Sequence, residues 1–238
     1  MINRWVVAVY MRIIKVVAWV IAAVVGPVRA HGRENLPGSG PYIIVTNHLS
    51  TIDVAIVLLA FPRQQMRVFA ADKWRRNPVT ALLLGLSGAI WVRRGEVDRK
   101  ALRAANEALL NGEILGMAPE GTRSRDGILH KARQGPAYIA SRANVQLVPV
   151  GIVNSDQFST NIRKLRRTDL QAHIGPTFRL PETAHRPNAK DLECYTELIM
   201  VHIARLLPER YHGYYAGSPA LAALVAGEDP WPAISEPD

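Results

Sequence analysis

The sequence predicts a single α/β domain with a mixed, mostly parallel sheet flanked by helices, preceded by an N-terminal amphipathic helix. Three observations lead to this prediction. Short apolar runs typical of buried strands alternate with helical patterns from residue 41 to residue 207. A chain of 238 residues, 48% hydrophobic and 21% charged, has the size and composition of one folded domain. Residues 1–28 are almost wholly apolar apart from three cations and an asparagine.

The N-terminal segment, residues 1–28, is too short in its uncharged part to cross a bilayer. Its longest uncharged run covers 13 residues, whereas a spanning helix needs about 20. On a helical wheel Arg4, Arg12 and Lys15 share one arc, with Trp5 and Trp19 at or near its edge. This pattern is typical of a helix that lies in the membrane interface with its basic side at the headgroups. A core helix and a cleaved secretory signal peptide are the alternatives.

The remaining elements follow in chain order from their hydrophobic period and their end signals. Strands are expected at residues 41–46, 67–71, 89–93, 113–118, 145–153 and 170–174. Helices are expected at residues 51–60, 78–86, 96–110, 135–143 and 188–207. Proline ends the first of these helices and begins the second, and Asn111-Gly112 ends the third.

Two segments are expected to be irregular. Residues 156–169 form a predicted loop that carries four cations, and residues 208–238 form a tail rich in Gly, Pro and Ala that is expected to be loosely held. The predicted organisation is therefore an interface helix at residues 1–28, a main domain at residues 29–207 and a loose tail at residues 208–238.

The charge balance favours an anionic partner. Lys and Arg total 29 against 20 Asp and Glu, a net charge of +9, which suits nucleic acid, acidic lipid or a phosphorylated substrate. Aromatic residues make up only 7% of the chain, which is poor for a module that stacks nucleic-acid bases. Cys194 is the only cysteine, which excludes an intramolecular disulfide and a multi-cysteine metal site.

A histidine and an aspartate five positions apart follow the first predicted strand. On one continuous helix His48 and Asp53 would not share a face. They can meet if His48 lies in the loop and Asp53 in the first turn of the next helix, which Ser50 or Thr51 would cap. Asp53 would then hold one imidazole nitrogen and leave the other free as a base. The alternative is a polar pair that only caps the helix.

Three further motifs lie in or directly after predicted strands. Glu120-Gly121-Thr122-Arg123-Ser124 follows the strand at 113–118, where α/β proteins bind ligands, and its arginine offers a fork for phosphate. Residues 88–95 place Arg93 and Arg94 at another strand end. Pro149 stands inside an apolar strand, which indicates a sheet edge, a bulge or a wall beside a ligand. Taken singly, the first two motifs also fit an ordinary turn and solvated charge.

Taken in order, these motifs resemble a known family. Asn47-His48-x4-Asp53, Gly-Ala-Ile-Trp-Val-Arg-Arg-Gly at 88–95, Pro-Glu-Gly-Thr-Arg-Ser at 119–124 and Val-Pro-Val at 148–150 resemble the four blocks of the glycerolipid acyltransferases. The resemblance is closest to bacterial 1-acylglycerol-3-phosphate (lysophosphatidate) acyltransferases and covers about residues 29–180. Two positions depart from the family pattern. Ala118 stands where an aromatic residue is usual, and Lys131-Ala-Arg-Gln-Gly135 replaces an aromatic-Lys-x-Gly run.

The resemblance implies a role for each matching residue. His48 would be the general base that takes the proton of the acceptor hydroxyl, and Asp53 would orient it. Arg94 would bind the acceptor phosphate, with Arg93 as the neighbouring alternative. The residues implied to bind substrate in the last two blocks are Glu120, Gly121, Thr122 and Arg123, which would hold the glycerol phosphate, and Pro149, which would lie beside the acyl donor or acceptor pocket.

The implied function is acyl transfer from a thioester, acyl-CoA or acyl carrier protein, to the sn-2 hydroxyl of 1-acylglycerol 3-phosphate, which makes phosphatidic acid. The protein would be peripheral (monotopic) on the cytoplasmic face of the cell membrane and would need no cofactor, no metal and no nucleic acid. One alternative is the same chemistry on glycerol 3-phosphate, a glycolipid or an aminoacyl lipid. A hydrolase that pairs His48 with a serine and a non-catalytic basic membrane- or nucleic-acid-binding protein are the others.

Overall fold

The structure is a computed structural model that describes residues 26–61, 66–86, 88–93, 98–182 and 186–235, together with the single positions 9, 12, 16 and 19. The N-terminal helix predicted for residues 1–28 therefore lies almost entirely outside the described residues. Within the part of the chain that is described, no helix is both long enough and apolar enough to cross a bilayer.

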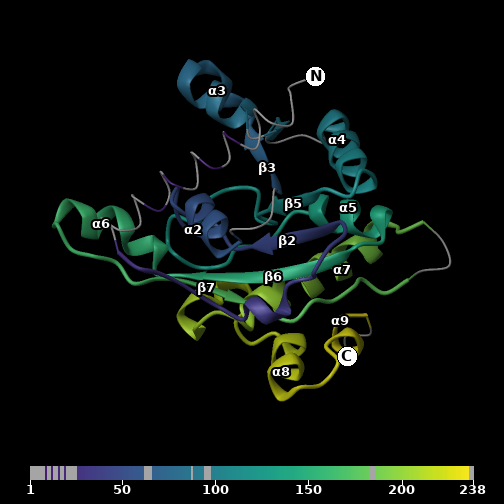
Figure 1. Ribbon diagram of the computed structural model, residues 1–238. Helices are drawn as coiled ribbons and strands as arrows, with labels where there is room; N and C mark the ends of the chain where they lie inside the picture. The colour runs from purple at the N-terminus through teal and green to yellow at the C-terminus, as the bar shows by residue number, and fades with distance from the viewer. Residues whose placement is uncertain are drawn as a thin grey trace.

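The described residues form a seven-stranded sheet at the centre of the fold (Figure 1). In spatial order its strands are β1 (Val28–His31), β7 (Leu170–Ile174), β6 (Gln146–Val153), β2 (Tyr42–Thr46), β5 (Ile114–Met117), β3 (Met66–Ala71) and β4 (Ile90–Val92). All neighbouring strands are parallel except β6 and β7. The prediction of a mixed, mostly parallel sheet is confirmed.

The edge strand β1 is an element that the sequence did not predict. It pairs with β7 from Val28 opposite Leu170 to His31 opposite His173. Val28 and Ala30, two positions apart, pack against the core. Four residues are too few for this alternation to be recognised in the sequence, because the apolar stretch before them favours a helix. The pairing joins the start of the domain to a strand about 140 residues later.

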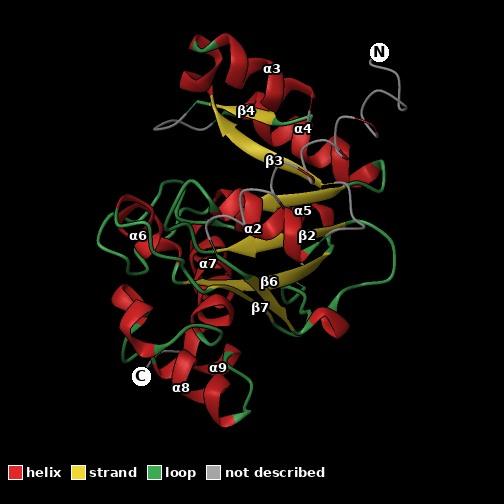
Figure 2. Ribbon diagram, turned by 60° about the vertical axis from the view of Figure 1, so that its left-hand side comes forward, coloured by secondary structure: helices red, strands yellow, loops and turns green. Residues whose placement is uncertain are grey.

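Helices cover both faces of the sheet (Figure 2). α2 (Asp53–Ala60) packs on one face, against a core that includes Val148, Val150 and Ile152 of β6. The opposite face is covered by α4 (Arg99–Leu110), α5 (Gly135–Ala143) and α7 (Ala189–Ala204). Because successive side chains of a strand point to opposite faces, Leu147 and Val153 of the same strand join this second core.

All five predicted helices form, two of them with the predicted bounds and three with shifted ends. α3 (Pro78–Leu86) has the predicted bounds, and α4 begins after Asp98, whose carboxylate accepts hydrogen bonds from the N–H groups of Lys100 and Ala101. α2 begins at Asp53 with Ile52 as its N-cap and no side-chain cap. The prediction that Ser50 or Thr51 caps this helix is therefore wrong, because the Asp53 carboxylate binds the preceding N–H groups instead.

The two segments predicted to be irregular contain regular structure. Part of the basic loop folds as η3 (Ser155–Gln157) and α6 (Phe158–Arg163). The tail forms η4 (Glu209–Tyr211), η5 (Gly213–Tyr215), α8 (Pro219–Ala226) and α9 (Trp231–Ser235). The prediction of a loosely held tail is wrong, because its aromatic and aliphatic side chains bury enough apolar surface to order it. Those buried in the core beside α7 are Tyr211, Tyr215, Leu221, Leu224 and Ile234.

Candidate active site

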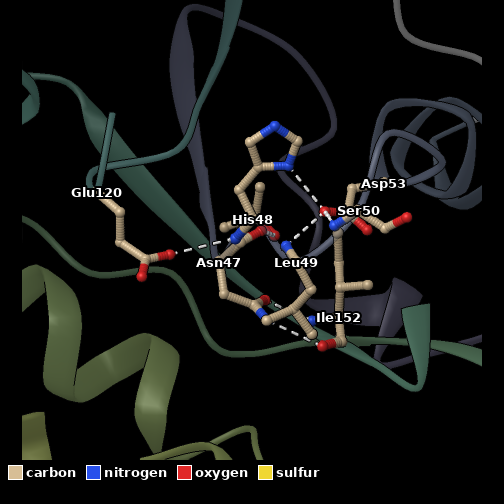
Figure 3. Close-up of polar contacts among 8 residues, drawn as sticks. Asn47, His48, Leu49, Ser50, Asp53, Glu120 and Ile152 are labelled. Atoms are coloured by element: carbon tan, nitrogen blue, oxygen red, sulfur yellow. Dashed lines mark hydrogen bonds and ion pairs between the residues drawn. The ribbon is translucent and has the colours of Figure 1, made fainter. Parts of the chain in front are cut away.

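His48 and Asp53 form a hydrogen-bonded pair at the carboxyl end of β2. Nδ1 of His48 lies 2.8 Å from Oδ2 of Asp53, as Figure 3 shows. His48 is in the loop after the strand, and Asp53 is the first residue of α2. The loop thus brings together two residues whose sequence spacing would separate them on a helix.

The Asp53 carboxylate fixes the shape of this loop as well as the histidine ring. The oxygen that binds His48 also accepts hydrogen bonds from the N–H groups of Leu49 at 2.7 Å and Ser50 at 2.8 Å. The Asp53 side chain is only 3% exposed, whereas that of His48 is 21% exposed. Because an ionised carboxylate only accepts hydrogen bonds, Nδ1 of His48 carries the proton. The lone pair is therefore on Nε2, which has no hydrogen-bond partner among the described residues and is available as a base.

An apolar cavity of about 150 Å³ begins at this pair and runs beneath α2 toward β3 and β4. Its polar end is formed by Thr46, His48 and Asp53. Most of its remaining wall is hydrocarbon, contributed by Ile44, Val54, Val57, Leu58, Met66, Val68, Phe69, Val92 and Met117. A base at the end of an apolar cavity suits a reaction at the polar head of a molecule with a hydrocarbon chain.

Glu120 lies on the other side of His48 from Asp53 (Figure 3). Its buried carboxylate accepts hydrogen bonds from two backbone groups, the N–H of His48 at 3.3 Å and the N–H of His130 at 3.0 Å. Burial raises the pKa of Glu120, and the two N–H donors oppose that rise. Both oxygens thus accept hydrogen bonds from the backbone, which gives Glu120 a positioning role. The glycerol phosphate contact that the resemblance implied stays a prediction.

The loop that follows Glu120 is tied directly to the histidine loop. The N–H of Ser124 donates to the carbonyl oxygen of His48 at 2.7 Å. Gly121 makes the required turn with a positive φ of 68°, and a β-carbon there would lie 3.0 Å from Cδ of Arg133. These contacts place Gly121 at the cavity wall.

Asn47 is a site residue to which the sequence interpretation gave no role. Its buried side chain donates to the carbonyl oxygen of Ile152 at 2.9 Å and accepts from the N–H of the same residue at 2.7 Å. These two hydrogen bonds anchor Asn47, the residue before His48, to β6. The only signal in the sequence was its place beside the histidine.

The C-terminal tail also supports the site. The N–H of Leu129 donates to the carbonyl oxygen of Tyr211 at 2.8 Å, and the N–H of Tyr214 donates to the carbonyl oxygen of Leu129 at 2.9 Å. The Tyr215 hydroxyl accepts from the N–H of Ala132 at 3.2 Å. Gly213 lies against the same loop, since a β-carbon there would lie 2.4 Å from the Leu129 carbonyl oxygen. The tail therefore holds residues 129–132, which include the His130 N–H bound by Glu120.

The predicted phosphate-binding residues lie in two places. Thr122 and Arg123 are exposed and border an open depression on the surface beside Glu120. Within the described residues the Arg123 side chain makes no hydrogen bond or ion pair. The backbone N–H of Arg93 donates to the Asp98 carboxylate at 3.0 Å. Arg94 lies outside the described residues, so the choice between the two arginines stays a prediction.

Pro149 lies apart from these residues. It is buried in β6, a strand paired on both sides by β2 and β7, and not at a sheet edge. Its ring lies beside Gly175, and Pro149 is not among the residues that line the cavity at His48. Pro149 therefore does not lie at the cavity that the described residues form, and its predicted place beside a substrate stays a prediction. The carbonyl oxygen of Pro149 accepts a hydrogen bond from the N–H of Gly175 at 2.9 Å, just past the end of β7 at Ile174.

The family model described as Acyltransferase matches residues 27–153, just over half of the chain. The match runs from β1 to the end of β6 and includes His48, Asp53 and the Glu120 loop.

Individual relatives carry one functional name. The 1-acyl-sn-glycerol-3-phosphate acyltransferase of Bacillus subtilis is 24% identical over 79% of this chain and 92% of its own length. That of Borreliella burgdorferi is 28% identical over 53% of this chain, and the match covers only 51% of the relative. The crystal structure of the 1-acyl-sn-glycerophosphate acyltransferase PlsC from Thermotoga maritima superposes with a TM-score of 0.63 at 25% identity. The superposition covers 79% of this chain and 76% of the Thermotoga chain.

The fold and the His48–Asp53 pair thus define an enzyme that transfers acyl groups. The chain belongs to the acyltransferase family.

Proposed function

We propose that the protein transfers a fatty acyl group from a thioester to the sn-2 hydroxyl of 1-acylglycerol 3-phosphate, which yields phosphatidic acid. The observation that carries this proposal is the His48–Asp53 pair, with Nε2 free, at the polar end of an apolar cavity. The names of the Bacillus and Thermotoga relatives support the choice of acceptor. The thioester is acyl-CoA or acyl carrier protein, and no metal or other cofactor takes part.

In the proposed reaction, Nε2 of His48 removes the proton of the acceptor hydroxyl while its oxygen attacks the thioester carbonyl carbon. The new C–O bond forms a tetrahedral intermediate, and Asp53 stabilises the imidazolium. The C–S bond then breaks, and the leaving thiolate takes the proton from Nε2. The apolar cavity binds the acyl chain. Arg123 and Arg94 bind the phosphate, since a guanidinium matches phosphate geometry.

The proposal includes an anchored protein at the cytoplasmic face of the membrane. Residues 1–28 would lie in the interface, because a spanning helix would place Arg12 and Lys15 in the bilayer at about 2.5–3.5 kcal/mol each. Cysteines introduced at residue 2 and at the exposed Ser39 should be labelled from the same side of oriented vesicles. Labelling of residue 2 from the opposite side alone would show a spanning helix.

The test of the reaction is release of free thiol by the purified protein with a panel of acceptors. We expect 1-acylglycerol 3-phosphate to be used at least about 10-fold more efficiently than glycerol 3-phosphate, a lysophospholipid without a free phosphate, or a glycolipid, because only it presents both groups that the site binds. Equal or faster use of another acceptor would move the proposal to that lipid. Thiol release without acyl product would identify a hydrolase.

A further inference from the structure

α3 is an apolar helix with little cover. Its sequence, PVTALLLGL, has no charged side chain, and none of its residues with described burial is buried. Leu82 is 62% exposed. Among the described elements, η2 (Asp72–Arg76) is the one on which α3 packs most. Both views place it beyond β3, at the end of the molecule opposite α8 (Figures 1 and 2). Apolar surface of this kind indicates an interaction site.

The neighbouring η2 supplies cations and an aromatic ring. Lys73, Trp74, Arg75 and Arg76 are all exposed, and Asp72 is the only carboxylate in the element. Lys73 Nζ lies 5.5 Å from the centroid of the Trp74 ring. Cations and tryptophan beside an apolar helix are the composition of segments that enter a membrane interface, where the ring lies among the headgroups.

This surface adjoins the cavity of the candidate active site. Ala71 lines the cavity, and η2 begins at the next residue. Val54 of α2 also lines the cavity and is 44% exposed. A bilayer in contact with η2 and α3 would therefore lie close to the place where an acyl chain enters.

We propose that η2 and α3, residues 72–86, form a membrane-docking surface separate from residues 1–28. Leu82 of α3 inserts among acyl chains, and Lys73 and Arg76 contact the headgroups of anionic lipids. The partner is an anionic bilayer, because the surface combines hydrocarbon with an excess of positive charge. The proposal rests on the proposed function only in that the acyl acceptor is a membrane lipid.

The test is sedimentation of the full-length protein with vesicles, without any acyl donor, at a lipid concentration that binds half of the wild type. Vesicles of phosphatidylcholine with phosphatidylglycerol are compared with vesicles of phosphatidylcholine alone. We expect Leu82→Glu to lower the partition coefficient by about 10-fold or more, the scale of one lost leucine burial. The Lys73→Glu/Arg76→Glu variant should lose about 10-fold or more on anionic vesicles and change little on neutral ones.

Val225→Glu is the matched control, because Val225 of α8 is also 62% exposed but lies at the opposite end of the molecule. It should sediment like the wild type. The proposal would be overturned if Leu82→Glu sedimented with vesicles like the wild type, or if Val225→Glu lost as much vesicle binding as Leu82→Glu. Binding is measured without catalysis, so absence of acyl transfer in the separate activity assay would leave this result standing.

A second measurement covers the case in which Leu82→Glu fails to fold. Leu82→Cys and Val225→Cys are labelled with a polarity-sensitive fluorophore, with labelled wild type as the background for Cys194. Emission from residue 82 alone should shift to the blue when anionic vesicles are added. A shift that depends on protein concentration without lipid would show a protein partner and contradict the proposal.

Discussion

The backbone N–H of His48 lies 3.3 Å from Oε2 of Glu120, a residue 72 positions later in the chain. The same carboxylate holds the N–H of His130, which belongs to the loop held by Tyr211 and Tyr215. The base is therefore positioned from two sides, by Asp53 through its ring and by Glu120 through its backbone.

Replacement of the base tests the chemistry. We expect His48→Ala to lower acyl transfer by about 10²–10⁴-fold, the usual contribution of general base catalysis. Asp53→Asn should also be severely impaired, because the amide no longer fixes the protonated Nδ1. The measurement is kcat of each variant beside its melting temperature. Activity of folded His48→Ala within about 10-fold of the wild type would contradict the assignment.

The Glu120→Gln variant distinguishes a role of Glu120 in positioning the His48 loop from a role in substrate binding. The glutamine amide directs an NH₂ group at one of two backbone N–H donors, so one charged hydrogen bond worth about 1.5–3 kcal/mol is lost. We expect kcat to fall by about 10- to 100-fold while KM for both substrates changes little. Glu107→Gln, at an exposed position of α4, is the control and should leave kcat unchanged. A rise in acceptor KM alone would restore Glu120 to the phosphate site.

Arg123 and Arg94 are tested through the acceptor. Loss of a charged hydrogen bond to phosphate should raise acceptor KM by about 10- to 100-fold in Arg123→Ala and in Arg94→Ala, with a smaller effect on the donor. Arg142→Ala, at an exposed position of α5, is the control. If donor KM rises instead, the arginines bind phosphates of the donor.

The tail is tested with two glycines that share a positive φ. Gly213 has φ 49° and lies against Leu129, whereas Gly217 has φ 76° and no neighbour within 4 Å. Both substitutions by alanine strain the backbone, but only Gly213→Ala displaces the loop that holds Glu120. We expect Gly213→Ala to lower kcat and melting temperature more than Gly217→Ala. Equal kcat values for the two variants would show that the tail has no influence on the site.

We expect His202 to make the stability of the fold sensitive to acid. Its ring stacks on Phe178 at 3.8 Å, and burial lowers the pKa of His202 to about 4. The unfolded chain takes up this proton near pH 6.5, so the stability of the fold falls as pH falls from about 6.5 to about 4, by on the order of 3 kcal/mol. Urea unfolding should show this loss in the wild type and a smaller one in His202→Gln. Equal pH dependence of the two proteins would refute the assignment.

Below pH 4 other groups control stability. Hydrogen bonds from Ser124 and His130 lower the pKa of Asp126 to about 2. A carboxylate of this kind stabilises the fold above its ordinary pKa and loses that effect as pH falls toward 2. Between pH 6.5 and 4 the loss of stability therefore comes from His202, together with His173, whose pKa burial also lowers, and not from Asp126.

The sequence indicated the elements whose signals are local. The alternation of strands and helices, Pro78 at the start of α3 and the His48–Asp53 spacing could each be interpreted within a few residues of the chain. β1 could not, because its four residues become a strand only by pairing with β7. The order of the tail likewise depends on burial of Tyr211 and Tyr215 beside α7, which is a property of the packed molecule.

The same distinction holds within the site. His48 and Asp53 were recognised because their chemistry is visible from their residue types. The roles of Asn47 and Glu120 depend on backbone partners 105 and 72 positions away, for which spacing gives no signal. The place of Pro149 beside a substrate stays a prediction, since a strand pattern alone does not tell which face a ligand occupies.

The hold of Tyr211 and Tyr215 on the loop at residues 129–132 sets an order of events during synthesis. At about 5–20 residues per second, a ribosome adds Tyr211 roughly 5–20 s after Glu120. Until then the His130 loop lacks its clamp, although the histidine, the aspartate and the sheet that bears them have already been translated. The support of the His48 loop is thus completed only after Tyr211 and Tyr215 have been translated, later than the residues of the pair and of the sheet.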